Sequence, residues 1–256
     1  MSNFAMKIMY DGTAYHGWQR QNNAVTVQET VEKTLFAVTG ENISVCGCSR
    51  TDAGVHALEY VLNFFSDTKI PPQNLVYAFN SALRTDDIRA LQCFSVKDDF
   101  SARFSSRGKV YIYKIWNSKI QNPFTLKYSW HIPQPLDFGA MKAAAAHFVG
   151  TYDFAGFMAQ GGSQKTTVRT VRRCEVFDKF EWDEQFAMEI EADAYLYNMV
   201  RIIAGTVAAC GVGRINPEDI PSIIESRDRT KGGATAPPCG LFLKNALYDY
   251  PEVIKK

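Results

Sequence analysis

The order of strand-like and helix-like patterns in the first part of the chain most constrains what it can fold into. Strand patterns occupy residues 4–10, 43–48, 58–65 and 88–96. Thr26-Val27-Gln28-Glu29 is a capping box that opens a helix to about Val38, and Pro71-Pro72 opens a second helix to about Leu83. In the strand at 58–65, apolar and polar residues alternate as in a half-buried strand. The resulting order, β-α-β-β-α-β, is that of a ferredoxin-like unit.

The second part of the chain repeats this organisation in a longer form. Strands are expected at 109–116, 170–178, 186–194 and 241–248, and helices at 137–149, at 196–210 and from Asn216-Pro217 onward. We therefore predict an α+β fold of two ferredoxin-like halves, residues 1–104 and 105–256, which form one mixed, mainly antiparallel sheet. A sheet of this kind leaves one face open for a ligand in a central cleft.

Composition excludes several classes of protein. No apolar run approaches the ~18 residues of a membrane helix, and the N-terminal sequence MSNFAMKIMY does not look like a signal peptide. We expect a cytoplasmic protein without a membrane partner. The six cysteines form no CxxC pair and have no histidine at zinc-ligand spacing, so we expect free, buried thiols and no metal.

Charge is unevenly distributed along a chain whose formal net charge is only +1. Two segments, 101–136 and 154–174, contain no Asp or Glu. Their basic residues are Arg103, Arg107, Lys109, Lys114, Lys119, Lys127, Lys165, Arg169, Arg172 and Arg173. A positive face on a nearly neutral protein suits a polyanion held in one cleft, although two solvated basic segments would look the same.

The densest group of functional residue types is the run from Cys48 to Ala57, CSRTDAGVHA. It lies between two predicted strands, so it is a loop. Asp52 precedes Ala53-Gly54, a pair typical of a tight turn that would project the carboxylate from the sheet edge. Arg50 is two residues away. Taken alone, this pattern is equally that of an Asx-turn with a nearby surface arginine.

Arg201 lies in a second such run, YLYNMVRIIAGT, at residues 195–206. On a helix, Met199 and Ile203 form an apolar stripe, while Arg201 shares a different face with Tyr197 and Gly205. A glycine one turn away would leave room beside the arginine. The alternative is a solvent-facing arginine on an amphipathic helix.

Tyr111 and Tyr113 share one face of a predicted strand beside basic residues. Exposed aromatic rings among Lys and Arg suit unstacked RNA bases. Tyrosines in the core of a sheet would show the same spacing.

Together these runs resemble the tRNA pseudouridine synthase I family, also called TruA, of the bacterial type, over nearly the whole chain. The resemblance is carried in order by YDGTAYHGWQRQ, TVQETVEKTL, GCSRTDAGVHA, FSARF, KVYIY, NPF, YDF, TTVRTV, YLYNMVR and APPCGL. The run RTDAGVHA is the most specific of these. Glu59 and Arg84 depart from the family pattern, which usually has a small residue and often a proline at these places.

The resemblance implies an isomerase with the pseudouridine synthase fold that converts uridine to pseudouridine at positions 38, 39 and 40 of the tRNA anticodon stem-loop. It implies that Asp52 is the nucleophile, Arg201 its ion-pair partner, Arg50 a base-flipping or phosphate-contacting residue, and Tyr111 the neighbour of the target uridine. A homodimer whose clefts hold tRNA is expected. The reaction needs no cofactor, metal or energy input.

Two other classes of function stay open from the residues alone. A catalytically silent RNA-binding or chaperone protein on the same fold would not need to keep all four of these residues. A hydrolase using a lone Asp would need a second acid or a metal cluster nearby, and the sequence offers neither.

Overall fold

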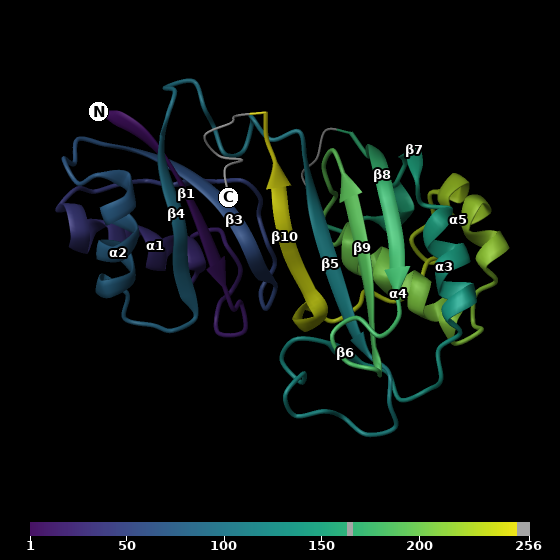
Figure 1. Cartoon of the computed structure of the whole chain (residues 1–256). Coiled ribbons are helices and arrows are strands. Elements are labelled where there is room, and N and C mark those ends of the chain that lie inside the picture. Colours follow the sequence, from purple (N-terminus) through teal and green to yellow (C-terminus); the bar gives the residue numbers. More distant parts are fainter. Residues whose placement is uncertain (163–165, 250–256) are drawn as a thin grey trace. The chain divides into compact units, whose positions relative to one another are not determined.

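The computed structural model describes residues 1–162 and 166–249, which form two compact units (Figure 1). The first unit contains Met1–Lys109 and the described part of the segment that begins at Phe242, and the second contains Val110–Leu241. The expected division at residue 104 differs from these units chiefly at the C-terminus. There Phe242 and Leu243 pair with His56 and Ala57, a long-range contact that no local pattern announces.

The first unit is a sheet with two α-helices. Its elements are β1 (Ser2–Tyr10), α1 (Val27–Thr39), β2 (Cys46–Gly47), β3 (His56–Ser66), α2 (Pro72–Ala82), β4 (Ile88–Val96) and β10 (Leu241–Leu247). The strand order is β4-β1-β3-β10, with β2 also beside β3. β1 is antiparallel to β3 and β4, whereas β10 is parallel to β3. The first six elements follow the ferredoxin-like order, and α1 and α2 lie on one side of the strands (Figure 1).

Helix α1 shows why the local predictions hold. The Thr26 side chain accepts a hydrogen bond from the Glu29 backbone N–H, as the capping box requires. The helix ends at Gly40, whose φ of 74° is left-handed. Val31 and Leu35, one turn apart on the helix, are fully buried. Cap residues and one buried stripe thus fix both ends and the orientation of the helix.

The second unit is a sheet with three α-helices and short 3-10 turns. Its strands are β5 (Gly108–Trp116), β6 (Trp130–His131), β7 (Gly150–Asp153), β8 (Val168–Phe177) and β9 (Gln185–Ala192). Its helices are α3 (Phe138–Ala146), α4 (Met199–Gly211) and α5 (Ile220–Ser226), with 3-10 turns at Ala155–Phe157, Pro217–Asp219 and Pro238–Gly240. The strand order is β5-β9-β8-β7, with β6 beside β5. The helix α3 packs against β8 and α4 (Figure 1).

The predicted fold class is confirmed: the chain is α+β, with mixed, mainly antiparallel strand pairing. The short strands β6 and β7 were not expected from the sequence, because each is too brief to show a period. All six cysteines are free thiols, as expected, but only Cys48, Cys93, Cys174 and Cys210 are fully buried.

The half-buried pattern predicted for β3 is wrong. Residues from Tyr60 to Phe64 are all buried, so both faces of the strand are covered. On one face, Asn63 receives a 2.8 Å hydrogen bond from the Ala102 backbone N–H, which places the segment after β4 over the strand. Alternation in the sequence reports the two faces of a strand but does not show that a distant segment covers the polar one.

Candidate active site

The loop that carries Asp52 ends in the tight turn expected from its sequence. The Val55 backbone N–H donates to the Asp52 carbonyl oxygen at 3.2 Å, and Gly54 has a φ of 76°. The turn lies directly before β3, which begins at His56. Asp52 is half-buried, while Arg50 on the same loop is exposed. The carboxylate therefore stands at the end of a rigid strand on a constrained backbone.

The loop after β1 supports this turn through close backbone contacts. The Trp18 backbone N–H donates to the Thr51 carbonyl oxygen at 3.1 Å, and the Tyr10 hydroxyl lies 2.9 Å from the Thr51 hydroxyl. A Cβ at Gly17 would lie only 2.5 Å from the Thr51 carbonyl oxygen, so only glycine allows this approach. In the sequence this loop is the run YDGTAYHGWQRQ of the family resemblance, and its role in supporting the Asp52 turn was not predicted.

Two aromatic rings contact the part of the Asp52 loop that precedes Arg50. The Trp18 and Tyr60 rings are stacked with centroids 4.1 Å apart. The Tyr60 hydroxyl donates a short hydrogen bond to the Ser49 carbonyl oxygen. Gly47 lies against both rings, since a Cβ there would collide with each of them. The backbone on both sides of Arg50 is thus held by side chains of the unit's own core.

Tyr111 lies on β5 in the second unit and is buried, as is Tyr113 two residues on. The Tyr111 ring meets the Tyr195 ring edge-on, with centroids 5.0 Å apart. The Tyr195 hydroxyl donates to the Ile190 carbonyl oxygen at 2.9 Å, and burial followed by the neighbouring Tyr111 raises the pKa of Tyr195. Tyr195 therefore stays neutral and positions the Tyr111 ring.

The expectation of two exposed tyrosines beside each other is wrong. The Tyr113 hydroxyl donates to the Pro237 carbonyl oxygen at 2.8 Å, and its ring is fully covered. Burial raises the pKa of Tyr113 well above its ordinary value. Tyr113 is a core residue, as the alternative reading of the strand allowed.

Arg201 lies in the first turn of α4, and two hydrogen bonds hold its guanidinium. Nε donates to the Ala236 carbonyl oxygen at 2.7 Å, and one terminal nitrogen donates to the Asn198 side-chain oxygen at 2.8 Å. Asn198 caps the helix with a left-handed φ of 59°. These bonds fix the plane of the guanidinium, which then presents its charge in one direction.

The amphipathic arrangement expected around Arg201 needs correction. The helix begins at Met199, so Tyr197 is not on it. Gly205 leaves no open room: a Cβ there would lie 1.8 Å from the Ala234 carbonyl oxygen. The segment from Ala234 to Ala236 packs on α4 at this glycine, because the Ala236 backbone N–H also donates to the Arg201 carbonyl oxygen at 3.1 Å.

Several residues of the two basic segments are neutralised within the second unit. Lys114 is buried and lies 2.6 Å from the Glu181 carboxylate. Arg173 contacts Glu175 and Glu189. Lys119 and Lys127 are exposed, whereas Lys165 lies outside the described residues. The basic segments overstate the positive charge that a partner would meet, since Glu175, Glu181 and Glu189 lie outside the two acid-free ranges and neutralise residues within them.

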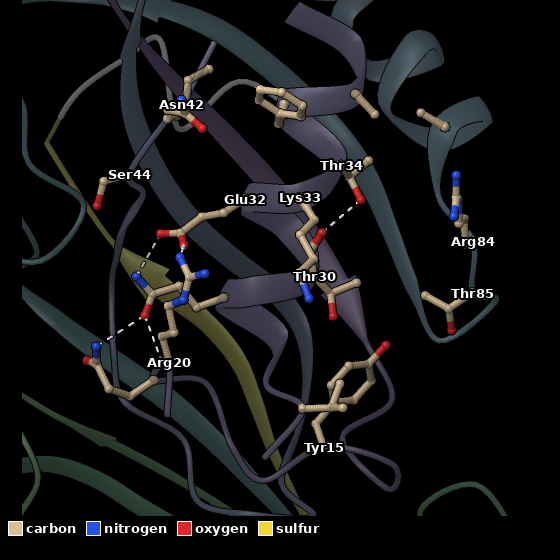
Figure 2. A pocket seen from close by; sticks show the side chains of 17 residues that line it. Tyr15, Arg20, Thr30, Glu32, Lys33, Thr34, Asn42, Ser44, Arg84 and Thr85 are labelled. Atoms are coloured by element: carbon tan, nitrogen blue, oxygen red, sulfur yellow. Dashed lines mark hydrogen bonds and ion pairs between the residues drawn. The ribbon is translucent and has the colours of Figure 1, made fainter. Parts of the chain in front are cut away.

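The first unit also has a pocket of about 1080 Å³ along α1, shown in Figure 2. Arg20 lies 2.9 Å from Glu32, and the Gln28 side chain bonds Glu32 at 3.0 Å. Neither Asp52 nor Arg50 is among the described residues that line it. Arg20 and Glu32 neutralise each other, and none of the proposed site residues lines the pocket, so it is not the candidate active site.

The described residues give no sign of a metal centre or a membrane helix. Within residues 1–162 and 166–249, no group of three His, Cys, Asp or Glu side chains is placed to hold a metal ion. No helix in those ranges has the length and apolar character to cross a bilayer.

Comparison with known proteins identifies the family. The sequence pattern of the tRNA pseudouridine synthases matches residues 6–105 and 144–249, which is more than half of the chain. The chain belongs to the tRNA pseudouridine synthase family. The resemblance noted in the sequence is thereby confirmed, and the matched ranges include Asp52, Arg50 and Arg201 but not Tyr111.

Full-length relatives give the same result. A protein named tRNA pseudouridine synthase A from Thermoanaerobacter sp. (strain X514) is 49% identical over 249 residues, which covers 97% of this chain and all of the relative. Proteins of that name from Acetivibrio thermocellus and Clostridium acetobutylicum are 44% and 41% identical over 248 residues, again 97% of this chain and all of each relative. Nothing among these relatives favours a catalytically silent protein.

Proposed function

We propose that this chain isomerises uridine to pseudouridine at positions 38, 39 and 40 of the tRNA anticodon stem-loop, with Asp52 as nucleophile. Family membership makes the chain a tRNA pseudouridine synthase, an isomerase. The observation that carries the residue assignment is the Asp52 turn. Its half-buried carboxylate lies just before the start of β3, on a loop whose backbone is contacted by Gly17 and hydrogen-bonded by Trp18. The three positions and the anticodon stem-loop are our extension of the resemblance.

The chemistry explains why an aspartate is needed. The N1–C1′ glycosidic bond breaks, the detached uracil turns, and a C5–C1′ bond forms. C5 loses its proton and N1 gains one, so the reaction is an isomerisation with no net change in protons or electrons. A carboxylate serves either as covalent partner or as stabiliser of charge on the sugar. It must be ionised in a site dry enough to retain the base, although burial by itself favours the protonated form.

We assign Arg201 as the group that keeps Asp52 ionised. A guanidinium stays charged where an ammonium would lose its proton, and it offers a planar donor set to a carboxylate. The hydrogen bonds to Ala236 and Asn198 support this role, because they pre-orient the guanidinium before substrate arrives.

Arg50 and Tyr111 are assigned to the substrate. The target base is stacked in RNA, and unstacking costs on the order of a few kcal/mol, which protein contacts must offset. Arg50 is exposed on the Asp52 loop and suits a phosphate or the space left by the flipped base. Tyr111 would lie against the flipped uracil, with Tyr195 behind it.

We further propose that the active form is a homodimer in the cytoplasm. Three adjacent nucleotides present different base edges, so one site must recognise the shape and backbone of the tRNA rather than its sequence. A second subunit would hold the body of the tRNA while Asp52 acts on the arm. Activity should then fall steeply with added salt, because phosphate contacts release counterions.

The test is a map of pseudouridines in tRNA from cells that lack this protein, made by carbodiimide modification and reverse transcription. Loss confined to positions 38–40, restored by the wild-type gene and not by the gene for Asp52→Asn, supports the proposal. Unchanged positions 38–40 with loss at the T-arm pseudouridine would refute the target assignment and leave the family chemistry intact.

A further inference from the structure

Residues 233–236 hold the guanidinium of Arg201, and their own position depends on side chains elsewhere in the second unit. The Ala236 carbonyl oxygen accepts from Arg201 Nε at 2.7 Å, and the Ala236 N–H donates to the Arg201 carbonyl oxygen at 3.1 Å. The segment 233–236 belongs to no helix or strand of the described chain. It therefore keeps its place through tertiary contacts rather than through a regular backbone ladder.

Arg229 binds this segment at two points with one guanidinium. One terminal nitrogen donates to the Gly233 carbonyl oxygen at 2.9 Å, and the other donates to the Thr235 hydroxyl at 3.1 Å. Because the guanidinium is planar and rigid, two acceptors bound at once fix both the distance and the orientation of the segment. Arg229 is half-buried, so water competes only in part for these bonds.

Thr206 attaches the same segment to α4. Its hydroxyl accepts from the Gly233 N–H at 2.9 Å and donates to the Ile202 carbonyl oxygen at 2.8 Å. Thr206 is completely buried. A Cβ on Gly233 would lie only 2.5 Å from the Gly205 carbonyl oxygen. The segment thus lies directly against the helix that carries Arg201.

The chain is also held just beyond Ala236. The buried Tyr113 hydroxyl donates to the Pro237 carbonyl oxygen at 2.8 Å. Ala236 therefore lies between two fixed points, Gly233 and Pro237. The carbonyl group that orients Arg201 keeps its position only while both points hold.

We propose that Arg229 and Thr206 are positioning residues for Arg201. The inference rests on the proposed function, in which Arg201 keeps Asp52 ionised. Without the bonds to Gly233, the Ala236 carbonyl is free to move away from Arg201 Nε, and the guanidinium loses its fixed plane. The rate then falls because misplaced groups are costly to catalysis, whereas the phosphate contacts that bind tRNA are unchanged.

The first measurement follows the Arg201 Nε–H itself, by NMR of the full-length protein labelled at arginine. The signal is identified by its absence in Arg201→Lys. In the wild type, the hydrogen bond to Ala236 should slow exchange of this proton with water. Arg229→Gln should speed the exchange about 10-fold, the effect of losing one ordinary hydrogen bond.

Arg227→Gln is the matched control, since it makes the same substitution two residues earlier on the chain. Arg227 is exposed, and its Nε lies 3.1 Å from the Asp153 carboxylate rather than on the segment 233–236. Its loss should leave the exchange of the Arg201 Nε–H unchanged. Circular dichroism melts establish that both variants are folded.

The second measurement compares the single-turnover rate at saturating tRNA with the affinity for tRNA. Arg229→Gln should lower the rate about 10-fold or more and leave the affinity within a few-fold. Arg227→Gln should change neither. Thr206→Val should resemble Arg229→Gln, whereas Thr206→Ser keeps the hydroxyl and should keep both the rate and the slow exchange. The two Thr206 variants decide the matter if Arg229→Gln does not fold.

Unchanged exchange of the Arg201 Nε–H in Arg229→Gln and Thr206→Val, whatever their rates, would overturn the inference. Lost tRNA affinity with unchanged exchange would overturn it too and make Arg229 an RNA contact. Faster exchange with an unchanged rate would support the positioning and refute the proposed role of Arg201 in the chemistry. The failure of this inference and the failure of the proposed function are thus distinguishable.

Discussion

The guanidinium of Arg201 donates from Nε to the backbone carbonyl oxygen of Ala236 at a distance of 2.7 Å. The two residues are also joined through their backbones, since the Ala236 N–H donates to the Arg201 carbonyl oxygen. Gly205 permits this approach because any side chain there would collide with Ala234. The orientation of the guanidinium is therefore set by the fold of the second unit.

Arg201→Lys should lower the single-turnover rate at least about 10-fold, although the positive charge is kept. An ammonium replaces a planar donor set with one point charge and has no Nε for Ala236. Tritium release from uridine labelled at C5 measures the rate, and filter binding measures the affinity for tRNA. A lysine variant that loses affinity while its rate stays intact would show that Arg201 is an RNA contact.

Gly17→Ala should disrupt the Asp52 turn. The new Cβ would lie 2.5 Å from the Thr51 carbonyl oxygen, and a φ of 85° is unfavourable for alanine. We expect a loss of about 1–3 kcal/mol in unfolding free energy and about 100-fold in rate, because misplacement by an ångström is costly to catalysis. Gly40→Ala is the matched control: its φ is 74° with no atom within 4 Å of the new Cβ, so only stability should fall. Equal catalytic rates in Gly17→Ala and Gly40→Ala would show that the loop after β1 does not hold the Asp52 turn in its active position.

Tyr111→Phe should lose activity while the melting temperature stays near that of the wild type. Phenylalanine preserves the edge-on contact with Tyr195 and removes only the hydroxyl. A large loss of rate would identify the hydroxyl as a hydrogen-bonding or proton-transfer group. If Tyr111→Phe is nearly normal and Tyr111→Ala is inactive, only the aromatic face acts on the uracil.

Stability should fall as the pH rises above about 9, because the buried thiols hold their protons only in the folded state. Burial raises the pKa of Cys48 to about 11 and that of Cys174 to about 12, whereas an unfolded thiol has a pKa of about 8.5. Below about pH 8.5 the thiols are protonated in both states, so their full contribution to the free energy of unfolding is present. Between about pH 8.5 and the folded pKa, the unfolded chain loses protons that the folded chain keeps. The free energy of unfolding then falls by up to about 1.4 kcal/mol per pH unit for each thiol.

Urea unfolding followed by tryptophan fluorescence at pH 8 and pH 10.5 checks this expectation. In Cys174→Ala, the free energy of unfolding should fall less steeply with pH, because one of the contributing thiols is absent. An unfolding free energy that holds constant or rises over this range would contradict the assigned burial of these groups.

Short-range patterns predicted most of the elements, because their determinants lie within a few residues. The bounds of β4 were predicted as they occur, and Thr26 defines the start of α1. The turn at Asp52 followed from Ala53-Gly54 in the same way. The runs that resemble the family indicated Asp52, Arg50 and Arg201 as site residues, although they do not show which contacts hold these side chains.

Long-range contacts were not predictable from the same patterns. Strand periodicity placed Tyr111 and Tyr113 on one face, but whether that face is covered depends on Pro237 and Tyr195, far along the chain. The parallel pairing of β10 with β3 and the packing of Gly205 on Ala234 have the same origin. Each joins segments whose proximity is decided by the whole fold.

The central claim is that Asp52 performs the isomerisation, and Asp52→Asn tests it most directly. The change keeps the shape of the side chain and removes only its charge, while tRNA binding depends on many phosphate contacts. Purified Asp52→Asn and wild type are compared on unmodified tRNA by tritium release from C5 under single-turnover conditions, with affinity measured in parallel. The account predicts no detectable release by the variant and an affinity within a few-fold of wild type. Release at a rate near that of the wild type would contradict it.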